Sequence, residues 1–257
     1  MTATEFTKTS GARYGFSNVA RMEWVKLRSL RSTWWTFAIT IAAAIGIAVA
    51  VGLNTKNATG DLTNNALGGV APGLLLTGVL GVLVMTNEYT SGMIRSTLAA
   101  APNRPLLLAA KAAVFGTVSL VVGEIASFAA FFVGTIAVPG TISGPAFSQP
   151  GVLRAVVLAG AGYFLIGLFG VGLGAIIRHT SAAVAVLVGG IYVAGSGLVA
   201  ISRSAGSYGP VSIVANSLST TQKLPHALSP WAGLGMLCLY AVVALGIGGW
   251  RLARRDA

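Results

Sequence analysis

Charged residues are scarce in this chain, and acidic residues are the scarcest of them. Only 9% of its 257 residues are Asp, Glu, Lys or Arg, with 6 acidic residues against 17 basic ones. Soluble domains carry about 25% charged residues, so this composition excludes an ordinary water-soluble globule. Because 54% of the residues are hydrophobic, the chain is predicted to be an integral membrane protein.

Cysteine and histidine are also nearly missing, which excludes several kinds of site. The single cysteine, Cys238, allows neither an intrachain disulfide nor a multi-cysteine metal cluster. The histidines, His179 and His226, fall in predicted loops, away from any buried serine. No Gly-x-x-x-x-Gly-Lys-Ser/Thr run is present to bind a nucleotide phosphate. We therefore expect no catalytic residue, no metal site and no cofactor bound by this chain.

Long apolar runs are what the chain has instead. A spanning helix needs about 20 mostly apolar residues, and windows this long favour helices over strands of alternating polarity. The predicted fold class is an all-α membrane protein with six transmembrane helices in residues 34–250. These follow an N-terminal tail and interfacial helix (1–33) and precede a cytoplasmic tail (251–257). The expected spans are 34–53, 68–86, 112–138, 155–177, 182–201 and 231–250.

The distribution of the basic residues predicts the orientation of these spans. Thirteen of the 17 Lys and Arg residues fall on the side of the N-terminus, and four fall on the other side. By the positive-inside rule, both termini are expected in the cytoplasm. The net charge of +11 is therefore interpreted as a topology signal, and no nucleic-acid partner is expected.

The segment before the first span is predicted to be a helix lying in the cytoplasmic membrane interface. Its basic residues point away from an apolar stripe, as in an interfacial helix. Glu23 falls within the stripe, where it would pair with Lys26 or face a partner protein. Anchoring on anionic lipid is the simpler interpretation of the same pattern. The stripe consists of Phe16, Val19, Ala20, Leu27 and Leu30, with Trp24 beside it.

The loop after the second span is predicted to carry a second short helix. Ile94, Leu98 and Ala101 share one helical face, and Pro102 and Pro105 are expected to end the helix. We expect these apolar side chains to be exposed to the cytosol as a docking surface. The neighbouring charged residues are Glu88, Arg95 and Arg104.

Several segments in this order resemble permease subunits of type-2 ABC exporters. The loop pattern that carries the resemblance is Glu88, Gly92, Leu98, Pro102, Arg104 and Lys111. The segment from Glu23 to Trp35 is similar to the start of many actinobacterial members. Residues 174–183 and the terminal residues 254–257 are similar to members as well.

The resemblance implies a connecting helix at residues 16–32 and a cytoplasmic coupling helix at about 91–101 that sits in a groove of an ABC ATPase subunit. It also implies a second permease copy, identical or different, with ATP and magnesium bound by the ATPases. The cargo would be a hydrophobic or amphipathic drug, antibiotic or lipid, exported across a bacterial cell membrane. The residues implied for coupling are Glu88, Gly92, Ile94, Arg95, Leu98, Pro102 and Arg104, and those of the connecting helix are Glu23, Trp24, Lys26 and Arg28.

Family members also carry short outer helices between spans five and six. Pro210 is a suitable first residue for such a helix, which would continue to Leu218; an apolar loop is the alternative interpretation of this segment. Its expected apolar face is Val211, Val214, Ala215 and Leu218.

Glu124 is the one charged residue inside an expected span. It lies 13 residues after Lys111, about 20 Å along a helix, and an ionisable group at that depth is a candidate for the substrate pathway. The alternative is a protonated side chain that forms a hydrogen bond to a neighbouring helix.

Gly170 and Gly174 have the spacing of close helix contacts, which would form within one chain or with a second copy of the permease.

Two other functions remain as alternatives to the exporter permease. One is a secondary transporter, and the other is a membrane partner of an ATPase that transports nothing itself.

Overall fold

The computed structural model describes residues 15–55, 61–140, 144–190, 206–220 and 228–254. This part of the chain folds as helices joined by turns and contains no strand. Five of its helices are long and apolar enough to cross a membrane, which gives the chain the character of a multi-pass membrane protein. They are α2 (Arg31–Leu53), α4 (Val70–Thr90), α6 (Arg104–Ala137), α7 (Val152–Ile177) and α12 (Pro230–Arg254).

These helices coincide with five of the six predicted spans. The remaining predicted span, 182–201, begins within α8 (Thr180–Val188), and its residues 191–201 lie outside the described residues. The largest difference concerns α6, which begins at Arg104 rather than at residue 112. The Asn103 side chain accepts a hydrogen bond from the amide of Leu106 (3.2 Å), and Pro105 lies in the first turn. Pro105 therefore starts a helix instead of ending one.

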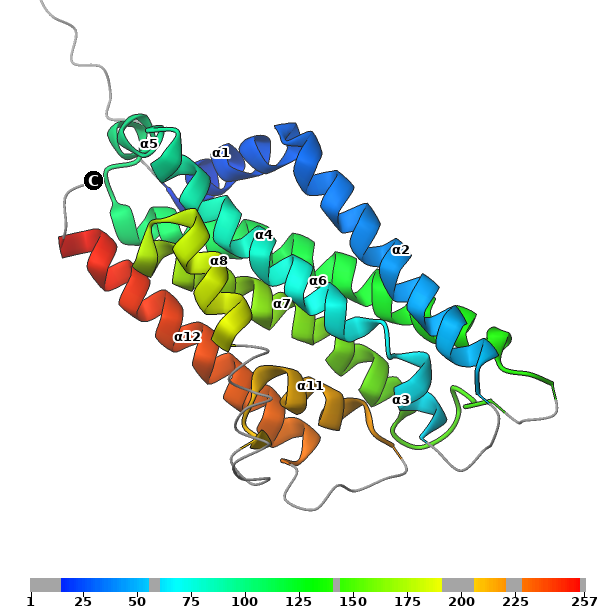
Figure 1. The fold of residues 1–257 in the computed structure, drawn as a ribbon. Coiled ribbons are helices and arrows are strands. Elements are labelled where there is room, and N and C mark those ends of the chain that lie inside the picture. Colours follow the sequence, from blue (N-terminus) through cyan, green and yellow to red (C-terminus); the bar gives the residue numbers. More distant parts are fainter. Residues whose placement is uncertain (1–14, 56–60, 141–143, 191–205, 221–227, 255–257) are drawn as a thin grey trace, which may run out of the picture.

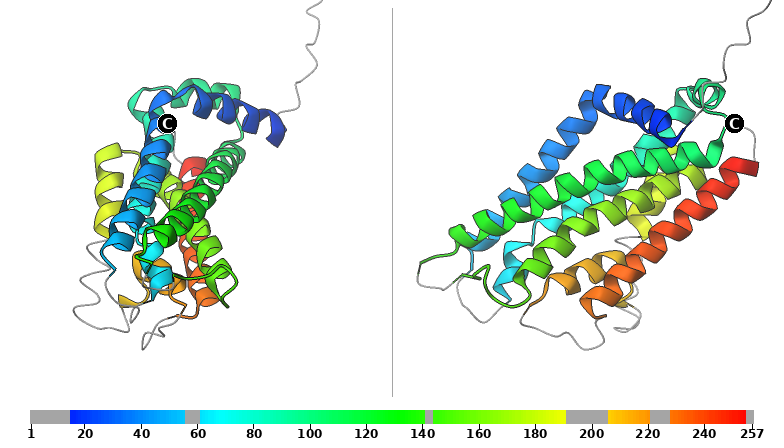
Figure 2. Two further views of the ribbon diagram at one scale, coloured as in Figure 1. Left: turned by 90° about the vertical axis from the view of Figure 1, so that its right-hand side faces the viewer. Right: turned by 180° about the vertical axis from the view of Figure 1, so that it is seen from behind.

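The long helices lie side by side, with short helices at both ends of the bundle (Figures 1 and 2). At one end lie α1 (Phe16–Ser29) and α5 (Ile94–Ala100); at the other lie α3 (Leu62–Ala66) and α11 (Pro210–Leu218). Among the described Lys and Arg residues, Arg154 is the only one at the end with α3 and α11. Within the described residues, the basic side chains are therefore concentrated at the end with α1 and α5.

Helix α7 lies at the centre of the bundle, in contact with α4, α6 and α12. Small residues make this possible. A methyl group added at Gly170 would collide with the carbonyl oxygen of Gly78 in α4, and one at Gly174 would meet Met85 of α4 at 2.9 Å. The Gly170–Gly174 spacing therefore serves contact between helices of one chain, which decides between the two interpretations of that motif.

Helix α11 forms over the predicted residues and packs against α7 and α12. Its buried face differs in part from the expected one: Ile213, Val214 and Leu218 are buried, whereas Ala215 is exposed. Next to it, Asp61 caps α3 and accepts a hydrogen bond from the Thr220 amide (2.5 Å). This bond ties the chain after α11 to the start of α3.

The close contact of α4 and α7 predicts a clear difference between two Gly→Ala substitutions. Gly170→Ala should lower the free energy of unfolding by about 1–3 kcal/mol, because it overpacks the contact with Gly78. Gly246→Ala in α12, where an added methyl group meets nothing within 4 Å, should be neutral or stabilise by up to about 1 kcal/mol. Reversible unfolding in mixed micelles measures both variants; equal effects would contradict the packing described for Gly170.

Candidate functional site

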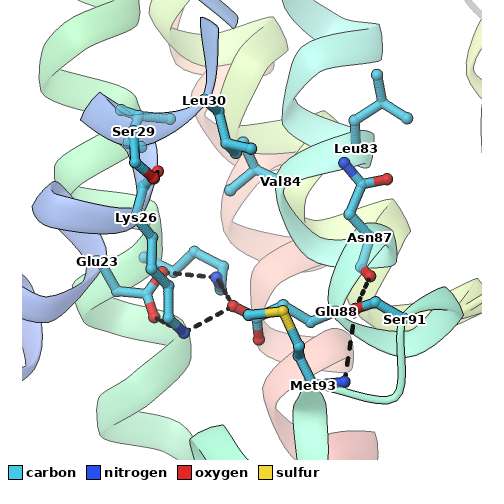
Figure 3. A pocket seen from close by; sticks show the side chains of 12 residues that line it. Glu23, Lys26, Ser29, Leu30, Leu83, Val84, Asn87, Glu88, Ser91 and Met93 are labelled. Carbon is cyan, nitrogen blue, oxygen red and sulfur yellow. Dashed lines mark hydrogen bonds and ion pairs between the residues drawn. The ribbon is translucent and has the colours of Figure 1, made fainter. Parts of the chain in front are cut away.

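Four charged side chains from three helices meet at the end of the bundle that carries α1 and α5 (Figure 3). They are Glu23 and Lys26 of α1, Glu88 of α4 and Lys111 of α6, and we call them the lysine–glutamate cluster. The Lys111 ammonium donates to Oε2 of Glu23 (2.6 Å) and to Oε1 of Glu88 (2.8 Å). The Lys26 ammonium donates to Oε1 of Glu23 (3.1 Å) and to Oε1 of Glu88 (2.9 Å). Each lysine thus bridges both glutamates.

Three members of the cluster are almost fully buried. The side chains of Lys111, Glu23 and Glu88 are 3%, 4% and 8% exposed, while that of Lys26 is 26% exposed. Removing charges from water is costly unless partners compensate them, and two ammonium groups facing two carboxylates provide that compensation. The cluster therefore holds α1 against α4 and α6 by charge-assisted hydrogen bonds.

A fourth helix joins the cluster through Lys26. Its ammonium also donates to the Thr97 hydroxyl of α5 (3.0 Å), so all three of its N–H groups are engaged. Burial lowers the pKa of Lys26, but the carboxylates of Glu23 and Glu88 outweigh burial and raise its pKa above the usual value. Lys26 therefore keeps its charge at neutral pH and links the short helix α5 to the rest of the cluster.

Glu23 enters the cluster because it lies on the buried, mostly apolar face of α1. Val19, Glu23 and Leu27 repeat every four residues and form the buried face of α1. Pairing with Lys26 was one of the two predicted roles of Glu23; the other, exposure to a partner protein, is wrong because Glu23 is buried. Trp24 and Arg28, also predicted for the connecting helix, lie on exposed positions of α1.

Sequence reasoning missed Lys111 as a member of the cluster. It was expected in a loop before the third span, but it lies within α6, two turns from the start of the helix. The signal for the earlier start was present in Asn103 followed by Pro105, a helix cap with a proline in the first turn.

The predicted coupling segment forms the short helix α5, but its apolar face is turned inward. Ile94 and Ala101 are buried and Leu98 is half-buried, so the expectation that these residues face the cytosol is wrong. Ala101 and Leu98 pack with Val19 of α1 and with the start of α6, because burial there removes apolar surface from water. The exposed positions of this segment are Ser91, Gly92, Met93, Arg95, Ser96, Ala99 and Ala100.

Other predicted coupling residues shape the connections of α5. Gly92 precedes it with a φ of +71°, a left-handed conformation that glycine adopts without strain. Pro102 follows Ala101, in the connection between α5 and α6. Arg104 donates to the carbonyl oxygen of Leu252 near the end of α12 (3.1 Å), so it fixes α6 to α12.

A cavity of about 300 Å³ adjoins the lysine–glutamate cluster between α1 and α4. The cluster forms one side of it, and aliphatic side chains together with small polar ones form the rest (Figure 3). Oε2 of Glu88 is buried and has no hydrogen-bond partner in the part of the chain that the structure describes. The other lining residues are Leu27, Ser29, Leu30, Leu83, Val84, Asn87, Ser91 and Met93.

Glu124, the candidate for the substrate pathway, lies in α6 away from the cluster. Its carboxylate occupies space left by Gly160 of α7, where an added methyl group would collide with it. Its Oε2 is buried without a hydrogen-bond partner among the described residues. The hydroxyl of Ser127 donates to the main-chain oxygen of Glu124 (3.1 Å) rather than to its carboxylate.

A scan of protein-family models matches none to this chain, and a search of curated proteins finds no similar sequence. The described residues also contain no group of three or more His, Cys, Asp or Glu that could hold a metal ion. The lysine–glutamate cluster, helix α5 and the adjoining cavity are therefore the features on which a function can be argued.

Removal of one cluster lysine should destabilise the fold strongly. Lys111→Met leaves two buried carboxylates with less compensation and should cost about 3–5 kcal/mol of unfolding free energy. Arg28→Met, an exposed charge on α1, should change it by less than about 0.5 kcal/mol. In a double-mutant cycle, Glu23→Gln should cost less in the Lys111→Met background than alone. Additive effects would show that the pair is not energetically coupled.

Proposed function

We propose that this chain is the permease subunit of an ATP-driven exporter of the type-2 ABC class. It works with a cytoplasmic ABC ATPase subunit and a second permease copy, and ATP and magnesium are bound by the ATPase. The cargo is a hydrophobic or amphipathic compound such as a drug, an antibiotic or a lipid. The resemblance of the loop from Glu88 to Lys111 to that class, together with the mechanical connection of α5, supports this proposal.

The observation that carries the proposal is the hydrogen bond between Thr97 of α5 and Lys26 of the lysine–glutamate cluster (3.0 Å). Helix α5 lies at the end of the bundle, presents an exposed face, and is joined through Lys26 to helices α1 and α4. A push on α5 from a partner protein would act on a buried network that ends on α4 and α6. A coupling helix must contact a partner protein on one face and be connected to the spanning helices on the other, and α5 has both features.

The proposal includes six spans, with α8 as the beginning of the fifth, and both termini in the cytoplasm of a bacterial cell. The concentration of basic residues at the end with α1 and α5 supports this orientation. In this orientation α1 is the interfacial connecting helix, on anionic lipid, and its exposed Trp24 and Val25 lie at headgroup level. α11 then lies at the outer surface.

Charge reversal on the outward face of α5 should separate the chain from its ATPase. Arg95 and Ala99 are exposed, four residues apart, and share one face of α5. The double substitution Arg95→Glu/Ala99→Asp should weaken ATPase binding about tenfold or more, since it places like or unpaired charge in the contact. The measurements are binding to a reconstituted ABC ATPase and the dependence of ATP hydrolysis on the chain.

The control for this experiment is Arg254→Glu, which changes charge at the same end of the bundle but on α12. It should leave binding and hydrolysis unchanged. Ile94 and Leu98 are unsuitable probes because they contribute to packing within the chain. Full binding by the α5 double variant, with the fold intact, would exclude α5 as the coupling helix.

A secondary transporter is the second candidate, and Glu124 is the observation that favours it. A buried carboxyl oxygen without a partner, inside a spanning helix, is typical of a proton-transfer site.

Glu124→Gln distinguishes the two functions. A proton-coupled transporter should lose about tenfold or more of its proton flux into liposomes in the absence of ATP, because glutamine cannot exchange a proton. The exporter proposal expects no such flux in either protein. Ser127→Ala, one turn away on α6, is the control and should behave as the unmodified chain. A pH-sensitive dye inside the liposomes gives the measurement.

A further inference from the structure

We propose that the adjoining ends of α7 and α12 bind the phosphate headgroup of an anionic membrane lipid. The site consists of Arg178, which follows α7, and of Arg251 and Arg254 in the last turn of α12. It goes beyond the exporter proposal, because it depends neither on transport nor on an ATPase. It rests on the fixed positions of the guanidinium groups, on their unused donors and on the apolar surface of α12 beside them.

Two crossed hydrogen bonds hold Arg178 and Arg251 at the contact between α7 and α12. Arg178 donates to the carbonyl oxygen of Arg251 (3.0 Å), and Arg251 donates to the carbonyl oxygen of Ile176 (3.0 Å). Each guanidinium group therefore lies against the end of the helix that carries the other arginine. Like charges held at one place repel each other, and a bound anion would offset this repulsion.

Arg178 has a backbone conformation that is uncommon for arginine. Its φ of +62° belongs to the left-handed region, which glycine usually occupies after the end of a helix. The guanidinium group lies over the ring of Tyr89 in α4, 5.3 Å from the ring centroid, in a cation–π contact. Tyr89 on α4 and the carbonyl oxygen of Arg251 on α12 thus fix the direction of this charge before any ligand binds.

The guanidinium groups have more donors than the described residues use. Each has five N–H donors, and Arg178 and Arg251 each donate one hydrogen bond to the described residues. No nitrogen of either side chain is both buried and unpaired, so the donors without a partner are accessible at the surface.

No described carboxylate compensates these arginines. The two described carboxylates at this end belong to the lysine–glutamate cluster, and none of the three arginines forms an ion pair in the part of the chain that the structure describes. Phosphate oxygens accept two parallel hydrogen bonds from one guanidinium group. A phosphate group would therefore supply both the missing negative charge and the missing acceptors.

The surface of α12 next to the arginines suits an acyl chain. Val243 and Ile247 lie two turns and one turn before Arg251, and both are exposed. The exposed Trp250 contacts the guanidinium group of Arg254, 4.8 Å from the centroid of its ring system. Tryptophan and basic residues are typical of the headgroup level, and aliphatic residues are typical of the hydrocarbon layer. A lipid with its phosphate at the arginines would thus extend its acyl chain along α12.

The test uses the full chain in phosphatidylcholine nanodiscs and a phosphatidylglycerol that carries a photoreactive diazirine near its headgroup. Saturable crosslinking should map to the peptides that contain residues 176–179 and 247–254. Unlabelled phosphatidylglycerol should compete at a mole fraction about tenfold or more lower than phosphatidylethanolamine, whose ammonium group compensates the phosphate charge. No saturable labelling, or equal competition by both lipids, would overturn the proposal. Equally strong competition by inorganic phosphate would identify a site for a free anion and would overturn the lipid assignment.

Two double substitutions with the same change of charge locate the site. Arg178→Gln/Arg251→Gln should reduce labelling of the α12 peptide about tenfold or more. Arg21→Gln/Arg28→Gln changes exposed positions of α1 at the same end of the bundle and should leave labelling of the α12 peptide unchanged. An equal loss in both variants would show a general effect of charge and would contradict the site.

Arg254→Gln provides a variant that leaves the helix ends intact, because Arg254 is exposed and donates no hydrogen bond within the described part of the chain. It should reduce labelling about threefold or more, since one positive charge is lost from the site. Full labelling of this variant would contradict the participation of the α12 end.

Discussion

The buried contact between Lys111 and Glu23 is the interaction on which one end of this bundle depends. Both side chains are nearly inaccessible to solvent, and their charged atoms lie 2.6 Å apart. A buried charge without its partner costs several kcal/mol, so neither residue is tolerable in this place alone. The pair therefore requires α1 to lie against α6. Glu88 brings in α4 for the same reason, and the hydrogen bond from Lys26 to the Thr97 hydroxyl brings in α5.

Different interactions stabilise the middle of the bundle and its end. Along the bundle, α7 approaches α4 closely because glycines such as Gly170 leave room for the backbone of the neighbouring helix. At the end with α1 and α5, hydrogen bonds of charged side chains join the helices. Arg178 donates to the carbonyl oxygen of Arg251 (3.0 Å), and Arg251 donates to that of Ile176 (3.0 Å), so the ends of α7 and α12 cap each other. Close backbone contacts therefore hold the middle of the bundle together, and charged side chains with their hydrogen bonds hold its end.

Several features of the fold follow from local patterns, and the failures have local causes as well. The apolar windows predict α2, α4, α7 and α12 within a few residues, because window length and hydropathy suffice to recognise a spanning helix. The start of α6 was missed because a proline can end one helix or begin the next, and its role depends on the cap before it. The helix α5 was predicted, yet the direction of its apolar face depends on neighbours that the local pattern does not contain.

By itself, the sequence determined that this is a helical membrane protein, where most of its spans lie, and that its basic residues gather at one end. Composition and helical period are local quantities, and they are sufficient for those conclusions. Only the tertiary structure decided that Glu23, Lys26, Glu88 and Lys111 form one cluster. Residues 23 and 111 are 88 positions apart, and only the packing of α1 on α6 brings their charges into contact. The inward face of α5 and the cavity beside Glu88 follow from that same packing, because each depends on which helices become neighbours.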